Sequence, residues 1–344
     1  MNNTKKLNFL KLKKIFLIAE CGVNHNGNLK YAKKLIQEAK LAGFDAVKFQ
    51  TYNVDHLVEK STALANYQKK TKCGSQYEML KNLSLKKHEF FKLKKFCDKL
   101  KIIFLSTPFD LESAKYLNSK LKVAAFKLSS ADINNYQLLN YIKKTKKPII
   151  LSTGMSSAKM INNSIKFLNY PKSKLAVLHC VSEYPTQLKN TFLGNLKKLK
   201  KKYLFGLSDH TKDEYAAVAA SVMGIKILEK HITISNKLKG PDHSASLSIR
   251  KLKKFVKIIR DVEYSSTQIK TNMTKKENNN YLVTRRKLFF RKKLLRGYKL
   301  KFEDILPLRS SLKHPIENSK ILNIIGKKIK KNVNKYDPIT KNLI

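Results

Sequence analysis

Eight short apolar runs constrain the fold of this chain more than any other feature of its sequence. They are rich in isoleucine, valine, leucine and phenylalanine, and most are separated by enough residues for one helix and two loops, as in βα units. The runs are Ile15–Glu20, Ala46–Phe49, Ile102–Ser106, Ala124–Leu128, Pro148–Ser152, Ala176–Val181, Leu204–Leu207 and Lys226–His231. Eight units predict an α/β fold, a (β/α)8 (TIM) barrel over residues 14–265.

A doubly wound sheet is the alternative arrangement, but it would use fewer strands and normally has a glycine-rich first turn. Neither G-x-G-x-x-G nor G-x-x-x-x-G-K occurs in the chain, so the barrel is favoured. The first helix has clear ends, with Asn28 as a suitable N-cap and Gly43 where the glycine after a helix belongs. The longest gap predicts an extra loop over Thr51–Leu83.

The region after the barrel changes in composition. Residues 266–281 are polar and rich in asparagine and lysine, which indicates a linker. Residues 282–344 regain apolar content, with Gly297, Pro307, Gly326 and Pro338 as turn signals. They predict a small β-rich C-terminal domain.

The charge balance is strongly basic, with 72 lysines and arginines against 24 aspartates and glutamates, a formal net charge of +48. Such a charge ordinarily suggests nucleic acid. However, only seven of the basic residues are arginine, which phosphate and base contacts favour for its bidentate geometry, and the lysines are spread along the whole chain. We interpret the charge as a lysine-coated surface and expect no specific nucleic-acid partner.

The four cysteines form no C-x-x-C pair, which argues against a disulfide framework and a thiolate zinc site and suits a reducing compartment. No apolar run approaches the ~18 residues that a membrane span needs, so we expect no membrane partner. The basic segment Met1–Lys14 precedes an apolar stretch, but that stretch ends at Glu20 and is too short for a signal peptide. These features predict a cytoplasmic protein.

Polar side chains follow almost every predicted strand. In a barrel of this type the carboxyl ends of the strands carry the active site, so residues at these ends are candidates for it. Lys48 and Lys127 provide two positive charges there, and hydroxyl groups come from Thr107, Ser130, Ser152 and Ser208. Together they suit a tetrahedral oxyanion such as phosphate, with or without a carboxylate beside it.

Two histidines follow adjacent strands, His210 after the seventh and His231 at the end of the eighth. Both can reach one divalent cation, with Glu229, Asp242 or water completing a shell of nitrogen and oxygen ligands. Such a shell suits Mn²⁺ or Mg²⁺. The residues alone therefore predict a phosphorylated small acid bound beside a Lewis-acidic metal.

Seven motifs, in order along the barrel, resemble those of the sialic acid synthase family. They are Ala19-Glu-Cys-Gly-Val-Asn-His-Asn-Gly27, Val47-Lys-Phe-Gln-Thr51, Leu105-Ser-Thr-Pro-Phe109, Leu151-Ser-Thr-Gly-Met155, Gly206-Leu-Ser-Asp-His-Thr211, Glu229-Lys-His231 and Gly240-Pro-Asp-His243. The resemblance implies condensation of phosphoenolpyruvate (PEP) with an N-acetylated hexosamine to give a nonulosonic acid and phosphate, with carbon–oxygen cleavage. It also implies that residues 282–344 form a SAF (antifreeze-like) domain, swapped between the subunits of a homodimer.

The resemblance assigns roles by position. Lys48, Thr107, Lys127, Ser130, Ser152, Ser182 and Ser208 would form the PEP pocket, and His210 and His231 would hold the metal. Glu20, Gln50, Tyr184 and Asp242 would contact the sugar, and Arg309 would reach in from the other subunit to hold its N-acyl group. Glu20, Lys48, Lys127, His210 and His231 are thus the predicted catalytic residues, with Glu20 a candidate for proton transfer.

Three positions depart from the family pattern. The fourth strand end reads Ser130-Ala131-Asp132 in place of Ser-Gly-Glu, which withdraws the carboxylate by about one methylene. Arg309 is followed by Ser-Ser in place of Pro-Gly, and Arg285-Arg286-Lys287 lacks the expected serine. We therefore expect the C-terminal domain to differ from the family more than the barrel does.

Several alternatives stay open from the sequence. The acceptor is N-acetylmannosamine or 2,4-diacetamido-2,4,6-trideoxymannose, or the chain is a pseudaminic-type synthase. A Schiff-base aldolase using Lys48 or Lys127 is the rival chemistry on the same barrel. A nucleic-acid-binding protein and an inactive relative are the remaining alternatives.

Overall fold

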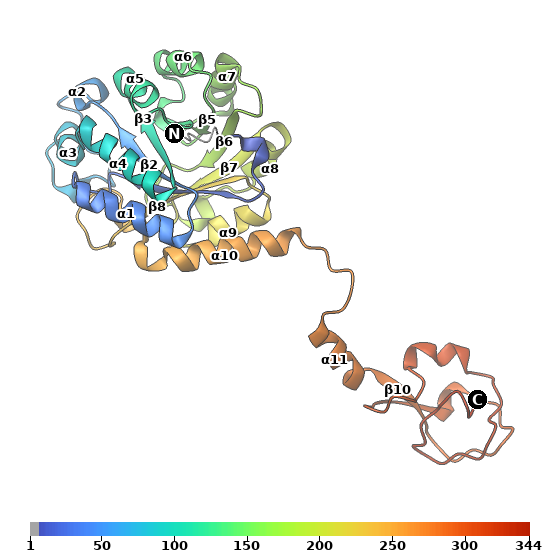
Figure 1. Ribbon diagram of the computed structural model, residues 1–344. Helices are drawn as coiled ribbons and strands as arrows, with labels where there is room; N and C mark the ends of the chain where they lie inside the picture. The colour runs from blue at the N-terminus through green and yellow to red at the C-terminus, as the bar shows by residue number, and fades with distance from the viewer. Residues whose placement is uncertain (1–6) are drawn as a thin grey trace. The chain divides into compact units, whose positions relative to one another are not determined.

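The computed structural model describes residues 7–344 of the chain (Figure 1). These residues form two compact units, which divide between Thr267 and Gln268. The first unit contains the predicted barrel, and the second contains the C-terminal residues.

Eight parallel strands form the inner wall of the first unit. They are β1 (Phe16–Gly22), β2 (Ala46–Thr51), β3 (Ile103–Pro108), β4 (Phe126–Leu128), β5 (Ile149–Ser152), β6 (Leu175–Cys180), β7 (Leu204–Asp209) and β8 (Ile227–Thr233). Their order is β3-β2-β1-β8-β7-β6-β5-β4, so that the first and last strands pair and only β3 and β4 lie side by side without a ladder. The predicted TIM barrel is confirmed.

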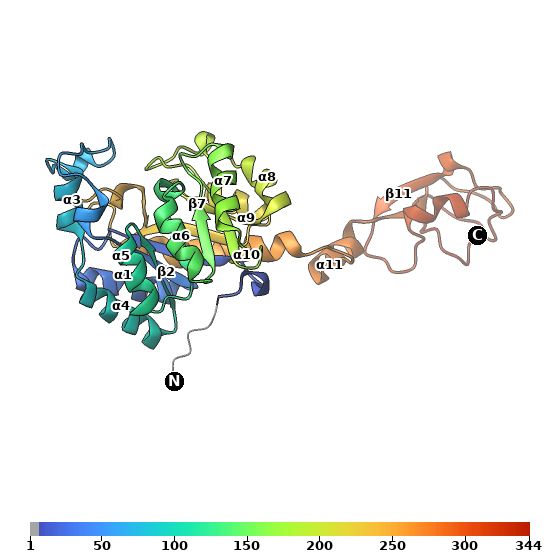
Figure 2. The same cartoon turned by 90° about the horizontal axis from the view of Figure 1, so that it is seen from above.

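The helices lie around the outside of the strands, as Figure 1 shows, and α5, α6 and α7 lie in this order from left to right on the near side of the first unit in Figure 2. The helices of this unit are α1 (Leu29–Ala42), α2 (Val54–Leu57), α3 (Gln76–Leu83), α4 (Lys87–Leu100), α5 (Leu111–Ser119), α6 (Tyr136–Lys144), α7 (Ala158–Leu168), α8 (Asn195–Lys202), α9 (Tyr215–Val222) and α10 (Ile249–Thr267). In α1 the Asn28 side chain accepts from two backbone N–H groups, and Gly43 ends the helix with φ +95°, as predicted.

Two apolar layers explain why the strands read as nearly continuous apolar runs. Side chains such as Ile18 and Ala46 point into the barrel lumen, where Phe9 of the N-terminal segment also packs. Their neighbours, such as Val47 and Phe49, pack outward against the helices. Strands buried on both faces cannot show the polar alternation of a half-exposed sheet. The polar residues are therefore informative where they do occur.

The extra segment predicted between the second and third strands contains α2 and α3. Val23, Met79 and Leu83 form a small apolar cluster that packs this segment against the loop after β1. A further short strand, β9 (Leu247–Ser248), pairs with the end of β8.

The second unit has its own small core around Leu288, Phe290 and Ile339. Its antiparallel pair consists of β10 (Arg286–Phe290) and β11 (Ile305–Arg309), and α11 (Lys275–Thr284) precedes it. The segment 266–281, interpreted above as a linker, holds the end of α10 and most of α11. The assignment of this unit as a SAF domain stays a prediction. Within residues 7–344, no helix has the length and apolar character that crossing a membrane requires.

Gly206 marks a close approach between β7 and β8. A Cβ there would lie 2.2 Å from the Ile227 carbonyl oxygen and 2.6 Å from Leu178 Cδ2. We expect Gly206→Ala to lower the free energy of unfolding by about 2–3 kcal/mol, because backbone and packed side chain must both move. Gly194→Ala, with nothing within 4 Å of its Cβ, is the control and should change it by less than about 0.5 kcal/mol. Equal effects in urea unfolding would contradict the close approach.

Candidate active site

A cavity of about 350 Å³ opens at the carboxyl ends of the barrel strands. Thirteen of the fourteen predicted site residues line it: Glu20, Lys48, Gln50, Thr107, Lys127, Ser130, Ser152, Ser182, Tyr184, Ser208, His210, His231 and Asp242. The exception is Arg309, at the end of β11 in the second unit. The structure thus brings together the predicted barrel residues, while their individual roles stay predictions.

Strand geometry directs the two lysines into this cavity. Lys127 lies between Phe126 and Leu128, which both pack outward against the helices, so its side chain points inward. Lys48 stands in the same relation to its own neighbours in β2. Both lysines are at most 5% exposed.

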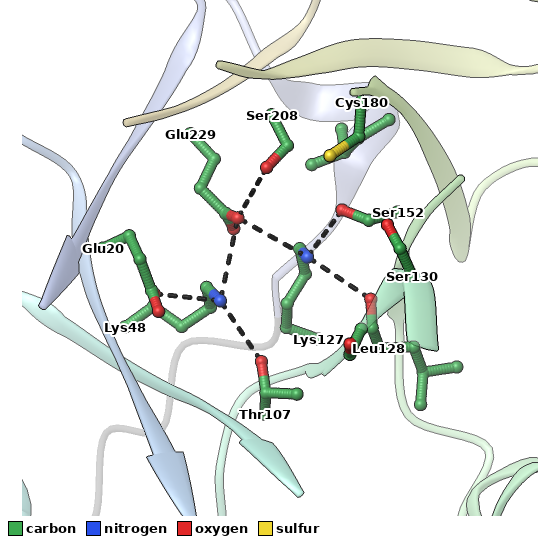
Figure 3. Close-up of polar contacts among 12 residues, drawn as sticks. Glu20, Lys48, Thr107, Lys127, Leu128, Ser130, Ser152, Cys180, Ser208 and Glu229 are labelled. Atoms are coloured by element: carbon green, nitrogen blue, oxygen red, sulfur yellow. Dashed lines mark hydrogen bonds and ion pairs between the residues drawn. The ribbon is translucent and has the colours of Figure 1, made fainter. Parts of the chain in front are cut away.

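A network of four buried charges connects these lysines (Figure 3). Lys48 Nζ lies 2.9 Å from Glu20 Oε2 and 3.6 Å from Glu229 Oε1. The same Glu229 oxygen lies 3.5 Å from Lys127 Nζ. Glu229 therefore bridges the two ammonium groups, and Glu20 pairs with Lys48 alone.

Hydroxyl groups surround the network. Lys48 donates to Thr107 Oγ1 at 3.2 Å, and Lys127 donates to Ser152 Oγ at 2.7 Å. Ser208 donates to Glu229 Oε1 at 2.9 Å. Three neighbouring hydroxyls and two ammonium groups thus converge on one small volume, which is the donor set that a phosphate or carboxylate group requires.

The two carboxylates differ in acidity although both are fully buried. Burial raises the pKa of Glu20, and Lys48 only partly offsets this effect. Burial acts on Glu229 in the same direction, but the two ammonium groups of Lys127 and Lys48 outweigh it and lower the pKa of Glu229. Glu229 is therefore the fixed negative charge of the site, and Glu20 is the carboxylate that can hold a proton nearer neutrality.

The two lysines differ in the same way. Burial lowers the pKa of Lys127, and Glu229 compensates only in part. Burial also acts against the charge of Lys48, but the carboxylates of Glu20 and Glu229 outweigh it, so the pKa of Lys48 is raised. Lys48 is held as a permanent cation.

Glu229 is not among the predicted catalytic and substrate-binding residues. From the sequence it is predicted only as an optional metal ligand. Its place in the structure is between the two lysines, where its side chain also accepts from the Ser208 hydroxyl. The signal was present in the sequence, since Glu229 and His231 are two residues apart in one strand and therefore point to the same face.

The two predicted metal ligands lie side by side at this end of the barrel. The ring centres of His210 and His231 are 5.2 Å apart. His210 Nδ1 lies 2.7 Å from the Val181 carbonyl oxygen, which can only accept, so Nδ1 donates. The Nε2 atom of the same ring lies 4.0 Å from Cys180 Sγ. Asp242 Oδ2 lies 3.7 Å from His231 Nδ1. Within residues 7–344 no group of three or more histidine, cysteine, aspartate or glutamate side chains is arranged to hold a metal.

Two tyrosines, Tyr184 and Tyr67, form an aromatic wall next to the histidines. The Tyr184 ring centre lies 4.2 Å from that of His210 and 5.0 Å from that of Tyr67. Tyr67 comes from the extra segment before α3 and was missed at the sequence level, because nothing in its local pattern ties that loop to the barrel mouth. Cys180, also unpredicted, lies with its Sγ 3.7 Å from His210 Nδ1.

The fourth strand end forms a tight corner of the cavity. Ser130 Oγ accepts from the Gly154 backbone N–H at 2.8 Å. A Cβ at Gly154 would lie 2.3 Å from Ser182 Oγ, so only glycine lets these two serines approach it. Asp132, the residue that departs from the family pattern, follows in the same turn and is 8% exposed.

Comparisons with known proteins show the family of this chain. The NeuB family model matches residues 35–271, more than half of the chain. The chain belongs to the NeuB family. Two N,N'-diacetyllegionaminic acid synthases are each 36% identical to it. That of Legionella pneumophila covers 97% of this chain and 96% of its own length, and that of Campylobacter jejuni covers 83% and 87%.

A solved structure also matches this NeuB-family chain. The N-acetylneuraminic acid (sialic acid) synthetase of Leptospira borgpetersenii, in complex with citrate, is 31% identical with a TM-score of 0.67, covering 78% of this chain and 90% of that one. The predicted resemblance to sialic acid synthases is therefore confirmed. The chain is an enzyme of that family, and the three relatives named here are nonulosonic acid synthases.

The pH dependence of stability tests whether Asp132, in the segment Ser130-Ala131-Asp132 that departs from the family pattern, is buried. Burial, with Asp110 nearby, raises its pKa to about 6, so the folded wild type holds this proton more tightly than the unfolded chain does. Stability from Asp132 is full below about pH 4 and is lost as pH rises through 6. Asp132→Asn cannot titrate. We expect its free energy of unfolding to rise by about 1–3 kcal/mol relative to wild type between pH 4 and 7. If urea denaturation gave the same difference in free energy of unfolding between Asp132→Asn and wild type at pH 4 and at pH 7, the burial of Asp132 would be contradicted.

Proposed function

We propose that the chain condenses PEP with an N-acetylated hexosamine to give a nonulosonic acid and phosphate. The observation that carries the proposal is the pair of buried ammonium groups, Lys48 and Lys127, bridged by Glu229 and surrounded by hydroxyl donors. A trianionic substrate seated among these donors would be stabilised far from competing water. The family relationship supports the same general reaction.

The lysine–hydroxyl pocket would bind the phosphate and carboxylate of PEP. Thr107, Ser130, Ser152, Ser182 and Ser208 supply hydroxyl groups at the same cavity wall. Because the lysines enter from two different strands, they can contact the substrate from two sides and fix its orientation. Preorganised donors of this kind stabilise the charge that grows on phosphate as the carbon–oxygen bond breaks.

His210 and His231 fit a divalent cation, Mn²⁺ or Mg²⁺. The Nδ1 atom of His231 is buried and has no hydrogen-bond partner among the described residues. The Nε2 atom of His210 has the thiol of Cys180, a weak hydrogen-bonding group, 4.0 Å away. Water or substrate oxygens would provide the remaining ligands beside Asp242. When bound, the cation supplies Lewis-acid polarisation of the acceptor aldehyde.

The reaction balances with the groups on hand. C3 of PEP forms the new bond to the aldehyde carbon of the open-chain sugar, and the aldehyde oxygen takes up a proton. Water adds at C2 of the resulting oxocarbenium ion and loses one proton. The C2–O bond to phosphate then breaks as the C2 carbonyl forms, so that phosphate leaves with the bridging oxygen and takes the second proton of the water. Glu20, whose pKa burial raises, is placed by Lys48 and by Gln50 Nε2, 3.2 Å from its Oε1. It holds or moves one of these protons.

The acceptor we favour is 2,4-diacetamido-2,4,6-trideoxymannose, since two relatives at 36% identity are N,N'-diacetyllegionaminic acid synthases. N-acetylmannosamine and a pseudaminic-type acceptor are the alternatives. Tyr184 and Asp242 lie beside His231, and Gln50 lines the same cavity next to Glu20. The sugar would lie against these residues.

The deciding experiment measures phosphate release from PEP with Mn²⁺ and each of the two hexosamines. EDTA is added in parallel, and Mn²⁺ is then restored. We expect release with one sugar, abolished by EDTA and recovered with the metal. If neither sugar gave phosphate release, in a protein shown to be folded by circular dichroism, the proposed acceptors would be contradicted.

A lysine aldolase is the second candidate, and the lowered pKa of Lys127 is the observation that favours it. The same assay separates the two reactions. An aldolase would be insensitive to EDTA, would release no phosphate, and would become covalently labelled on a lysine when borohydride is added with substrate.

Arg309 tests the proposed swapped homodimer, in which the C-terminal unit serves as a SAF domain over the partner's cavity. We expect Arg309→Ala to raise the KM for the sugar at least about tenfold, with the KM for PEP nearly unchanged, because a guanidinium bonded to the N-acyl group touches only the sugar. Arg296→Ala, an exposed arginine of the same unit, is the matched control. Equal effects of Arg309→Ala on both substrates would place Arg309 elsewhere.

A further inference from the structure

Lys230 is a fully buried charge that the proposed mechanism does not use. It lies in β8 between Glu229 and His231, which both line the cavity, so its own side chain points to the opposite, outer side of the strand. It is 1% exposed. An ammonium group removed from water to this degree persists only with full compensation.

That compensation comes entirely from the end of β7 and the loop after it. Lys230 Nζ lies 2.7 Å from Asp209 Oδ2 and donates to the carbonyl oxygens of Thr211, at 2.5 Å, and Asp213, at 2.9 Å. The other oxygen of Asp209 accepts from the Thr211 backbone N–H at 2.8 Å. Lys230 thus binds the turn 209–213 on the outer side of the barrel, opposite the cavity.

The same turn carries His210. Asp209 and Lys230 are partners in the β7–β8 ladder, and each immediately precedes one of the two histidines in the sequence. The ion pair and the two histidines therefore lie on opposite sides of the same two strand ends.

We infer that Lys230 and Asp209 are positioning residues that fix the spacing of His210 and His231. A buried ion pair is often no more stabilising than an apolar pair of similar volume, so its value lies in the geometry it specifies. Here that geometry is the separation of two imidazoles at a cation site. The inference rests on the proposed function in so far as those imidazoles bind the metal.

The test is Lys230→Met in the full-length protein, which keeps the side-chain length and removes the charge. Without substrates, Mn²⁺ binding measured by electron paramagnetic resonance should weaken about 10–100-fold, the range for groups that orient metal ligands. PEP binding measured by calorimetry should stay within about twofold, because Lys48 and Lys127 are untouched. His231→Ala is the reference for loss of a ligand.

Arg260→Met is the matched control for loss of an ion pair elsewhere in the barrel. Arg260 pairs with Asp45 at 3.0 Å and donates to the Ile15 carbonyl at 2.6 Å, next to the amino ends of β1 and β2. We expect Arg260→Met to lower the melting temperature of the protein without weakening Mn²⁺ binding. If Lys230→Met has the same profile as Arg260→Met, the positioning role is overturned.

A second readout does not depend on the metal. The Nδ1 proton of His210, held by the Val181 carbonyl, should give a slowly exchanging imidazole signal in ¹⁵N-resolved spectra of the metal-free wild type. Lys230→Met should lose or shift it, whereas an unchanged signal would overturn the inference. Should wild type bind no Mn²⁺, the proposed metal fails and this signal still decides the role of Lys230. Asp209→Asn serves in the same tests if Lys230→Met does not fold.

Discussion

The balance of four buried charges at the barrel mouth is the constraint on which the rest of the site depends. Two lysines within one small volume repel one another, and neither would stay charged without a carboxylate beside it. Glu229 contacts both ammonium groups, whereas Glu20 forms an ion pair with the ammonium group of Lys48. Because of this unequal sharing, the pKa of Lys48 is raised and that of Glu229 is lowered, so both keep their charges. The pKa of Lys127 is lowered and that of Glu20 is raised, so these are the two groups whose protonation can change nearer neutrality.

Strand register sets which of these residues are neighbours across the barrel wall. Glu20 is paired with Lys48 on one side and with His231 on the other, and Ser208 is paired with Glu229. Because parallel strands point the same way, residues near their carboxyl ends meet without help from long loops. The loops then add what the strands lack, such as the aromatic wall near the histidines.

The sequence predicted the barrel, its strand ends and most of the cavity lining, because strand period and apolar runs are local signals. It did not show that Glu229 bridges two lysines, since a contact between three strands is not a property of any one segment. Tyr67 was out of reach for the same reason, as its loop meets the barrel only through tertiary packing. Lys230 looked like one more lysine among 65 until its burial was known.

The sequence by itself determined the order of the βα units, the helix ends at Asn28 and Gly43, and which polar residues follow each strand. These follow from dihedral preferences and from side-chain alternation along a single strand. Only the tertiary structure decided which charges pair, which nitrogen of His210 donates to a carbonyl, and which lysine faces outward to hold a turn. The physical reason is that pairing energies and pKa values depend on burial and distance between strands far apart in the chain.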